Sequence, residues 1–174
     1  PVLLTCNHVS YVDALVIGGC VPRPVRFVMY YKIFDIPVMR GLFRTAGAIP
    51  IASKKEDPAL LAEAFDKIDA ALKRGEAVCF FPEGTLTRTG ELNTFRPGLE
   101  TILQRRPVPV VPMALDGLWG TFFSRAGKGV MRRLPKPLWF RVDMRVGEPI
   151  GADAATAERL QQEVGVLLGD NAGQ

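Results

Sequence analysis

The sequence predicts an α/β fold, with a largely parallel β-sheet flanked by helices, and two observations carry this prediction. Apolar runs of strand length alternate along the chain with stretches in which apolar residues recur at helical spacing. This alternation is typical of parallel strands joined by helices. The run AVCFFP (77–82) is apolar throughout, which fits a strand covered on both faces. Because 174 residues is the size of one domain, we expect a single domain over residues 1–174.

Strands and helical stretches alternate in the first part of the chain. The expected strands are VLLTC (2–6), RFVMY (26–30) and AIPI (48–51). The expected helices cover residues 10–20, 32–45 and 57–75. Pro37 should interrupt the second helix, and Pro50 favours an edge or a bulge for the third strand.

The stretch 57–75 has the clearest helix signals. Asp57 is suited to the N-cap position, Pro58 to the first helical position, and Gly75 to the end of the helix. The apolar residues that recur at helical spacing between them are Leu61, Ala64, Phe65, Ile68 and Leu72.

The second part of the chain continues the same alternation. After the buried strand 77–82, a helix should follow Pro97. The remaining strands are expected at VPVVPMAL (108–115) and LWFRVDMRV (138–146), and a last helix at about 153–168.

The composition is that of a globular domain with a basic lean, at 48% hydrophobic residues, 23% charged residues and a formal net charge of +4. No apolar run reaches the roughly 18 to 20 residues that span a bilayer, so any membrane attachment is expected to be peripheral. The chain opens at Pro1 without the features of a signal peptide. We therefore expect that it is part of a longer protein.

The cysteines and the missing motifs exclude several chemistries. Cys6, Cys20 and Cys79 are odd in number, widely spaced and set in apolar surroundings, which favours buried thiols in a reducing compartment over disulfides or a metal cluster. The chain has one histidine and lacks G-x-G-x-x-G, Walker and G-x-S-x-G motifs. Zinc, dinucleotide and serine-hydrolase chemistry are therefore not expected.

The stretch CNHVSYVD (6–13) contains that histidine, His8, with Asp13 five positions later. It follows the first strand, and functional residues of such folds gather at the carboxyl ends of strands. The Asp13 carboxylate could hold one imidazole nitrogen of His8 and leave the other free to accept a proton. The alternative is a capping box, in which Ser10 and Asp13 cap a helix and His8 only fills the loop. The two geometries are compatible, and the sequence leaves both open.

A second candidate site follows the buried strand at FPEGTLTRTG (81–90). Gly84 permits close approach to the backbone, whose N–H groups could hold an anion beside Glu83 and Thr85. Arg88 adds a donor suited to phosphate. The alternative is a turn with a solvated charge.

The two sites together resemble the glycerolipid acyltransferase family, which includes the 1-acylglycerol-3-phosphate acyltransferases. NHVSYVD resembles the family's first motif, N-H-x-S-x-x-D, and FPEGT its third motif. GAIPIAS (47–53) and VPVVPMAL (108–115) stand at the places of the second and fourth motifs. The run FPEGTLTRTGELNTFRPG is most like the acyltransferase domain of bacterial 2-acylglycerophosphoethanolamine acyltransferases.

The resemblance implies a glycerol-3-phosphate acyltransferase-like fold and an O-acyltransferase with His8 as general base and Asp13 as its catalytic partner. It implies a lysophospholipid acceptor, acyl-CoA or acyl carrier protein as donor co-substrate, and no further cofactor. The residues expected to bind substrate are Glu83, Gly84, Thr85, Arg88, Lys54 and Ser10. Two positions depart from the family: Ser53 and Leu86 stand where many members carry an arginine linked to the acceptor phosphate.

The main alternative is a noncatalytic module of the same fold that binds membrane lipid, against which the intact His8 and Asp13 argue. Nucleic-acid binding is not expected, because no motif supports it and the charge is modest. We expect the domain to work at the cytoplasmic face of a membrane.

A segment between Asp116 and Asp143 is expected to contact the membrane surface, because it has no acidic residue. Its basic residues are Arg125, Lys128, Arg132, Arg133, Lys136 and Arg141. Interleaved apolar residues are Phe122, Phe123, Met131, Leu134, Leu138 and Trp139. Basic and aromatic residues together favour an anionic membrane interface. The alternatives are apolar residues that belong to the core, or a surface that docks acyl carrier protein.

Overall fold

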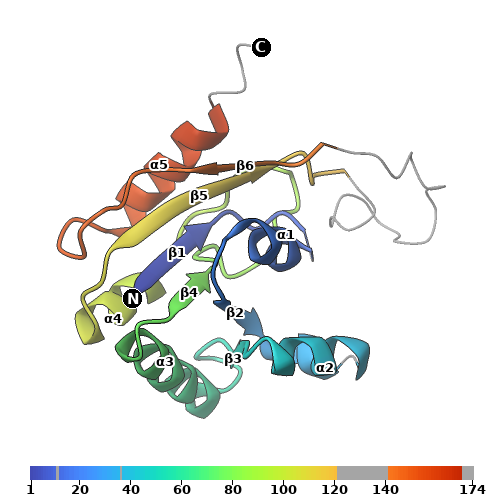
Figure 1. The fold of residues 1–174 in the computed structure, drawn as a ribbon, viewed down its shortest axis with the longest axis vertical. Helices are drawn as coiled ribbons and strands as arrows, with labels where there is room; N and C mark the ends of the chain where they lie inside the picture. The colour runs from blue at the N-terminus through green and yellow to red at the C-terminus, as the bar shows by residue number, and fades with distance from the viewer. Residues whose placement is uncertain (11, 36, 121–140, 170–174) are drawn as a thin grey trace.

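The computed structural model of this chain describes residues 1–10, 12–35, 37–120 and 141–169 (Figure 1). These residues form a six-stranded sheet in the order β3-β2-β4-β1-β5-β6. The strands are β1 (Val2–Cys6), β2 (Val25–Tyr30), β3 (Ile49–Ile51), β4 (Ala77–Phe80), β5 (Val110–Asp116) and β6 (Asp143–Val146). All neighbouring strands run parallel except β6, which is antiparallel to β5. The predicted α/β fold with a largely parallel sheet is thus confirmed.

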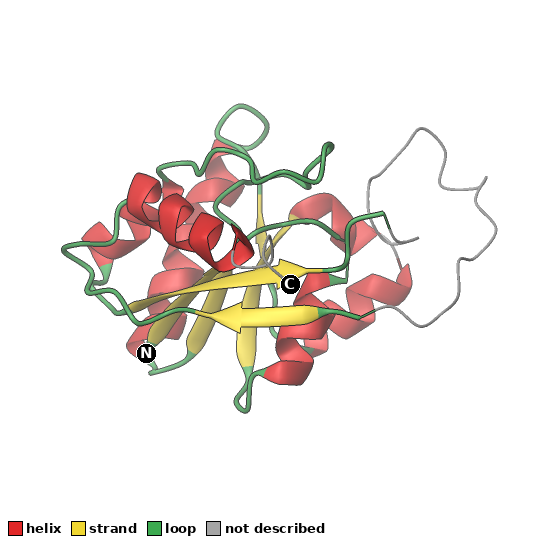
Figure 2. Ribbon diagram, turned by 90° about the horizontal axis from the view of Figure 1, so that it is seen from above, coloured by secondary structure: helices red, strands yellow, loops and turns green. Residues whose placement is uncertain are grey.

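Helices cover both faces of this sheet (Figure 2). The helices are α1 (Asp13–Cys20), the 3-10 helix η1 (Tyr31–Asp35), α2 (Pro37–Thr45), α3 (Pro58–Lys73), α4 (Gly98–Arg105) and α5 (Ala157–Gly169). Leu3 of β1 packs into the core shared with α3, α4 and α5, whereas Leu4 and Cys6 pack on the opposite face with α1 and α2. The central strands are therefore apolar on both faces, which explains their continuous apolar runs.

Several local predictions are confirmed. Asp57 caps α3 by accepting a 2.9 Å hydrogen bond from the backbone N–H of Leu60. Gly75 follows the helix with a φ of +82°, a conformation that favours glycine. β3 lies at the edge of the sheet, as Pro50 indicated. The predicted break at Pro37 separates η1 from α2.

Other boundaries differ from the prediction. α1 begins at Asp13 rather than at residue 10, and α5 at Ala157 rather than near residue 153. Thr156 accounts for the second difference, because its Oγ1 accepts a 3.2 Å hydrogen bond from the N–H of Arg159 and so caps the helix. β4 ends at Phe80, two residues early.

The prediction of buried thiols holds for two of the three cysteines. Cys6 and Cys79 are buried, whereas Cys20 is exposed, so that prediction was wrong for Cys20. The reason lies in α1, which buries Ala14 and Ile17 and turns its last residues toward solvent.

Most of the expected membrane segment, residues 121–140, lies outside the described residues. Arg141 is described, and it is exposed and paired with Asp143 at 2.9 Å. Within the described residues, no helix is both long and apolar enough to cross a membrane.

The parallel strands β1 to β5 end at one edge of the sheet, where ligands of open α/β sheets bind. Because β1 lies between β4 and β5, residues 7–10 after β1 lie beside residues 81–97 after β4. The fold thereby joins the two stretches that the sequence singled out.

Candidate active site

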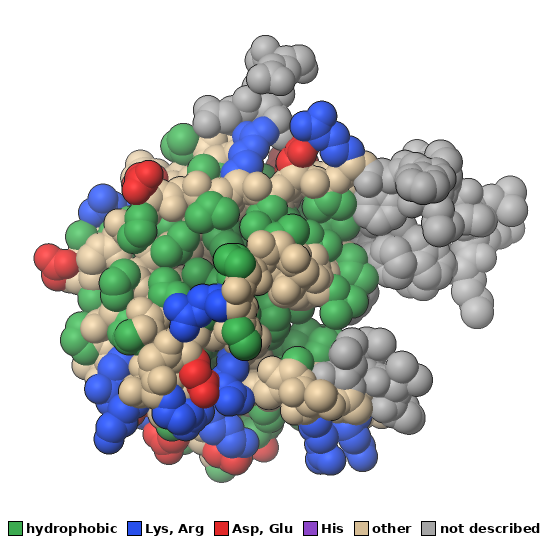
Figure 3. Space-filling model, viewed as in Figure 1, with side chains coloured by type: hydrophobic (Ala, Val, Ile, Leu, Met, Phe, Trp, Pro, Cys, Tyr) green, Lys and Arg blue, Asp and Glu red, His purple; other side chains and the backbone are tan. Residues whose placement is uncertain are grey.

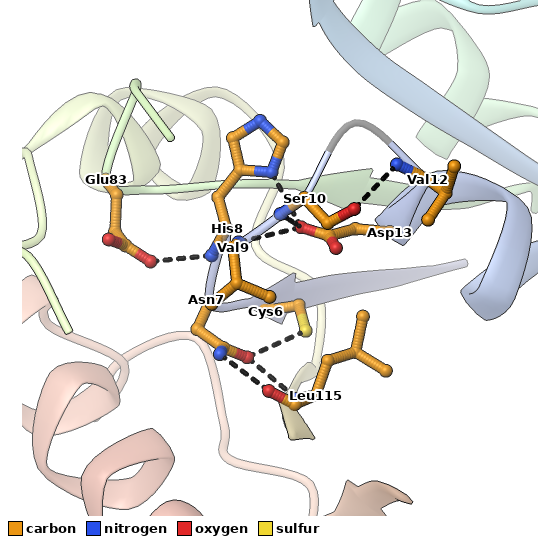
Figure 4. A network of polar contacts seen from close by, with 9 residues as sticks. All are labelled: Cys6, Asn7, His8, Val9, Ser10, Val12, Asp13, Glu83 and Leu115. Carbon is orange, nitrogen blue, oxygen red and sulfur yellow. Dashed lines mark hydrogen bonds and ion pairs between the residues drawn. The ribbon is translucent and has the colours of Figure 1, made fainter. Parts of the chain in front are cut away.

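His8 and Asp13 are in direct contact. Nδ1 of the imidazole lies 2.9 Å from Oδ2 of the carboxylate (Figure 4). The Asp13 side chain is fully buried, whereas 23% of the His8 side chain is exposed. The pair thus combines a fixed carboxylate with an imidazole that solvent and a ligand can reach.

The same carboxylate oxygen also holds the loop that precedes α1. Oδ2 of Asp13 accepts hydrogen bonds from the backbone N–H of Val9 at 2.9 Å and of Ser10 at 3.0 Å. Oγ of Ser10 accepts a 3.2 Å bond from the N–H of Val12. The His–Asp contact is therefore present, whereas only one bond of the predicted capping box forms, from the N–H of Ser10 to Asp13, because α1 begins at Asp13 without a side-chain cap.

These contacts determine which imidazole nitrogen carries the proton. A carboxylate oxygen can only accept a hydrogen bond, so the neutral ring donates from Nδ1 and keeps a lone pair on Nε2. Nε2 has no hydrogen-bond partner among the described residues and points away from Asp13 in Figure 4. The ring stacks on Phe81, with centroids 4.4 Å apart. Asp13 and Phe81 together fix the ring plane, and Nε2 is free to accept a proton.

The loop of residues 81–97 holds the backbone of His8 from both sides. Oε1 of Glu83 accepts a 2.7 Å hydrogen bond from the N–H of His8, and Oε2 accepts one of 2.9 Å from the N–H of Asn93. The N–H of Thr87 donates to the carbonyl of His8 at 2.9 Å. Both polar backbone groups of His8 are thus tied to this loop.

Glu83 is almost completely buried, with 2% of its surface exposed. Burial raises the pKa of its carboxyl group, and the hydrogen bonds from the N–H groups of His8 and Asn93 oppose that rise only in part. Because both oxygens serve backbone N–H groups, the contacts of Glu83 in this structure are internal to the protein.

Asn7 anchors the other side of the His8 loop. Its Nδ2 donates to the carbonyl of Leu115 at 2.9 Å, and its Oδ1 accepts from the N–H of Leu115 at 2.8 Å. This paired contact continues the pairing of β1 with β5 beyond the end of β1. The candidate base therefore stands on a loop fixed to both neighbouring strands.

The structure brings only some of the predicted substrate-binding residues close to His8. Glu83 contacts its backbone, and Gly84 and Thr85 follow Glu83 as exposed residues. Arg88 is exposed one residue beyond Thr87, whereas Ser10 is fully buried. Lys54 follows the edge strand β3, three strands away from β1. At the usual strand spacing this is about 14 Å, so Lys54 is not brought together with His8.

The sequence did not single out the contributions of Asn7, Phe81, Thr87 and Asn93. Asn7, Phe81 and Thr87 lie within the two recognised motifs or next to them. Only the hydrogen bonds and ring stacking show that they hold His8. Asn93 acts through its backbone N–H, which no residue pattern reveals.

Two other features are distinct from this site. A cavity of about 400 Å³ opens at the amino end of β2, where Arg26 pairs with Glu76 and Arg23 donates to the carbonyl of Gly75. It therefore lies at the opposite edge of the sheet from His8. The described residues contain no cluster of three or more His, Cys, Asp or Glu side chains that could hold a metal ion.

Comparisons with known proteins show similarity to acyltransferases. The 1-acyl-sn-glycerol-3-phosphate acyltransferase of Brassica napus chloroplasts is 30% identical over 131 residues, which cover 75% of this chain and 37% of that protein. The 1-acyl-sn-glycerol-3-phosphate acyltransferase of Bacillus subtilis is 28% identical over 149 residues, 85% of this chain and 66% of its own length. The lyso-ornithine lipid O-acyltransferase of Pseudomonas aeruginosa is 30% identical over 116 residues, 67% of this chain and 43% of its length. This chain thus spans only part of each relative.

A solved structure and a family model agree with these similarities. The crystal structure of the 1-acyl-sn-glycerophosphate acyltransferase from Thermotoga maritima superposes with a TM-score of 0.74, covering 99% of this chain and 66% of that chain. The two sequences are 19% identical, so this likeness concerns the fold. The model of the Acyltransferase family matches residues 1–116, more than half of the sequence. The chain belongs to the Acyltransferase family.

Proposed function

We propose that this chain transfers a fatty acyl group from an acyl thioester, carried by coenzyme A or acyl carrier protein, to a hydroxyl of a lysophospholipid, with His8 as general base. The observation that carries the proposal is the 2.9 Å contact between Nδ1 of His8 and the buried Asp13 carboxylate. It leaves Nε2 as a proton acceptor at the exposed side of the ring.

In the proposed reaction, Nε2 of His8 takes the proton of the acceptor hydroxyl while the hydroxyl oxygen attacks the thioester carbonyl carbon. Asp13 stabilises the imidazolium that forms. The C–S bond of the tetrahedral intermediate then breaks, and the proton on Nε2 passes to the departing thiolate. A thioester is already activated for this attack, so the reaction needs neither a covalent acyl-enzyme nor a further cofactor.

Membership of the Acyltransferase family supports acyl transfer. The names of the relatives support a lysolipid acceptor, since they act on 1-acylglycerol phosphate or on lyso-ornithine lipid. In this proposal the exposed residues Gly84, Thr85 and Arg88 contribute to acceptor binding beside His8. Because a lysolipid resides in a bilayer, the proposal includes work at a membrane surface, and the cytoplasmic face is the one that the sequence led us to expect.

The test is an assay of thiol release with a matrix of substrates. Lysophosphatidate, lysophosphatidylethanolamine and lyso-ornithine lipid are each combined with acyl-CoA and with acyl carrier protein thioester. A Cys20→Ser background removes the exposed thiol that would react with the detection reagent. We expect thiol release that depends on at least one acceptor, together with the acylated lipid product. Thiol release at the same rate with and without an acceptor would indicate a thioesterase. Lipid binding without thiol release would indicate a noncatalytic module.

A further inference from the structure

Arg96 lies against the glycine that follows Glu83. A Cβ atom built on Gly84 would come within 3.3 Å of Cδ, Nε and Cζ of Arg96. Gly84 has a φ of +67°, so its backbone has a conformation that favours glycine. The N–H of Arg96 donates to the carbonyl of Pro82 at 2.9 Å. Both the backbone and the side chain of Arg96 are therefore fixed to the segment 82–84.

The charge of Arg96 is not used inside the described part of the protein. Its side chain is exposed and forms no ion pair with a described residue. The nearby Glu83 is not its partner, because each Glu83 oxygen accepts a backbone N–H. By contrast, Arg26, Arg105 and Arg106 are each paired with a carboxylate. Arg96 thus presents an exposed guanidinium group that has no ion pair among the described residues.

Arg96 lies on the same loop, residues 81–97, that holds the backbone of His8. Glu83 contacts the backbone of His8 at 2.7 Å, and Arg96 packs on the adjacent residue, Gly84. In a lysophospholipid only a few covalent bonds separate the reacting hydroxyl from the phosphate. A residue that binds this phosphate must therefore lie on a segment that directly adjoins His8.

The other cations considered for this role are less well placed. Arg88 stands in the tight turn that Thr87 closes by donating from Oγ1 to the carbonyl of Glu91 at 2.7 Å. The exposed Arg88 side chain forms no hydrogen bond or ion pair with a described residue. Lys54 lies three strands away along the sheet. At position 86 many members of the family carry an arginine, but this chain has Leu86, which is buried with 8% exposure.

We propose that Arg96 binds the phosphate of the acceptor lysophospholipid and so determines that the acceptor is a phospholipid. This inference rests on the proposed function. The planar guanidinium group donates two parallel hydrogen bonds to phosphate oxygens, a geometry that a lysine ammonium does not reproduce. Its packing on Gly84 reduces the freedom that phosphate binding would otherwise have to remove.

The experiment compares Arg96→Gln, Arg96→Lys and Arg88→Gln with wild type. Arg23→Gln is the matched control, since Arg23 is an exposed arginine at the opposite edge of the sheet. Steady-state kinetics are measured with lysophosphatidate and with 1-monoacylglycerol, which has the hydroxyl but no phosphate. Binding of a short-chain lysophosphatidate, below its micelle concentration, is measured by calorimetry without a thioester.

Arg96→Gln should raise the KM for lysophosphatidate about 10- to 100-fold, the usual range for a lost charged hydrogen bond. Less than about a twofold change is expected in kcat, in the KM for the donor and in the rate with monoacylglycerol. This is the pattern for a variant that loses only ground-state binding of the acceptor phosphate. Arg96→Lys should fall between wild type and Arg96→Gln. Arg88→Gln should raise the acceptor KM less than Arg96→Gln does, and the Arg23→Gln control should match wild type.

The role of Arg96 is overturned if the acceptor KM is unchanged, if the donor KM rises instead, or if Arg88→Gln alone shows the effect. Calorimetry separates this inference from the proposed function. Weaker lysophosphatidate binding by Arg96→Gln supports the phosphate site even if wild type transfers no acyl group. If wild type transfers the acyl group and Arg96→Gln has no effect, the proposed function is supported and the phosphate-binding role of Arg96 is refuted.

Discussion

A single oxygen atom, Oδ2 of Asp13, links the loop before α1 to the orientation of the candidate base. It accepts from Nδ1 of His8 and from the N–H groups of Val9 and Ser10. Asp13, the first residue of α1, thus holds both this loop and the imidazole. Replacing Asp13 would therefore affect both the loop and the imidazole, so His8 is the better position at which to test chemistry.

The first prediction concerns Glu83. In wild type the two carboxylate oxygens of Glu83 accept hydrogen bonds from the backbone N–H groups of His8 and Asn93. In Glu83→Gln one of these oxygens becomes an amide NH₂, which cannot accept, so the hydrogen bond at His8 or at Asn93 is lost. A shift of about 1 Å in a reacting group costs about 10²-fold in rate, and we expect a kcat loss of that order. Measurement of kcat and of both KM values for Glu83→Gln checks this. An unchanged kcat would show that the contact does not position His8.

The pH dependence of stability gives a second readout for Glu83. Burial raises the pKa of this carboxyl group in the folded protein. Its stabilising contribution is therefore fully present below the ordinary pKa of glutamate and is lost as the pH rises through the raised pKa. Urea unfolding across that window should show a loss of stability with rising pH in wild type that Glu83→Gln lacks. Identical pH profiles would contradict the burial of an ionisable group here.

Sequence reasoning predicted the contact between His8 and Asp13 but not the residues that support it. His8 and Asp13 were identifiable because their residue types and spacing are specific. The anchors of His8 were not identifiable from the sequence. Asn7 bonds to the backbone of Leu115, and Thr87 donates its own N–H to the carbonyl of His8, so each contact joins residues that are distant in sequence. Arg96 was missed for a similar reason: only packing places its side chain on Gly84.

At the scale of elements, Arg26 of β2 joins three segments at the amino edge of the sheet. Its guanidinium group pairs with Glu76, just before β4, and donates to the carbonyl of Gly47 at 3.1 Å. A Cβ on Gly47 would overlap a guanidinium nitrogen of Arg26, so a side chain there would displace the arginine. This contact fixes the turn after α2 against β2 and β4.

The second prediction follows from this ion pair. The hydrogen bond from Arg26, and then that from Arg74, lower the pKa of Glu76 to about 2. The stabilisation is therefore present above the ordinary pKa of glutamate and is lost as the pH falls toward about 2. Glu76→Gln should reduce the unfolding free energy by about 0.5 to 1 kcal/mol near pH 7, since solvent screens the pair.

Urea unfolding at several pH values checks the Glu76 prediction, with Glu148→Gln as control. Glu148 is exposed and has no ion pair among the described residues. The difference between wild type and Glu76→Gln should shrink toward zero in acid. A constant difference at all pH values would assign the effect to packing rather than to charge.

The elements themselves were largely predictable, and their ends were not. Apolar runs located the described strands, because a strand covered on both faces needs apolar side chains at every position. The starts of α1 and α5 were placed too early, because α1 begins at Asp13 without a side-chain cap and Thr156 caps α5. β6 lies within the predicted strand 138–146 but begins only at Asp143, and its antiparallel direction depends on the whole sheet.

At the scale of the molecule, basic side chains gather over α3 and α2 on the face shown in Figure 3. Several of those on α3 or just after it are paired, for example Lys67 with Glu63 and Arg74 with Glu76. Paired charges attract an anionic surface only weakly. We therefore expect membrane attraction from the acid-free segment 117–142, although residues 121–140 lie outside the described residues.

The third prediction is that Arg132→Glu/Arg133→Glu weakens sedimentation with anionic vesicles. Each basic group near an anionic leaflet contributes about 1 kcal/mol, so the double reversal should reduce binding at least tenfold at low salt. Arg23→Glu/Lys73→Glu makes the same charge change elsewhere and should bind like wild type. Equal loss in both variants would point to net charge alone, and no loss in either would refute membrane contact by this segment.

The central claim, that His8 is the base of an acyl transfer, is tested most directly by His8→Ala in the Cys20→Ser background. His8 lies in a loop with an exposed ring edge, so circular dichroism and thermal unfolding should show a retained fold. The account predicts that kcat for acyl transfer to the preferred lysolipid falls about 10²- to 10⁴-fold, with partial recovery on adding free imidazole. A folded His8→Ala variant that transfers the acyl group at nearly the wild-type rate would contradict it.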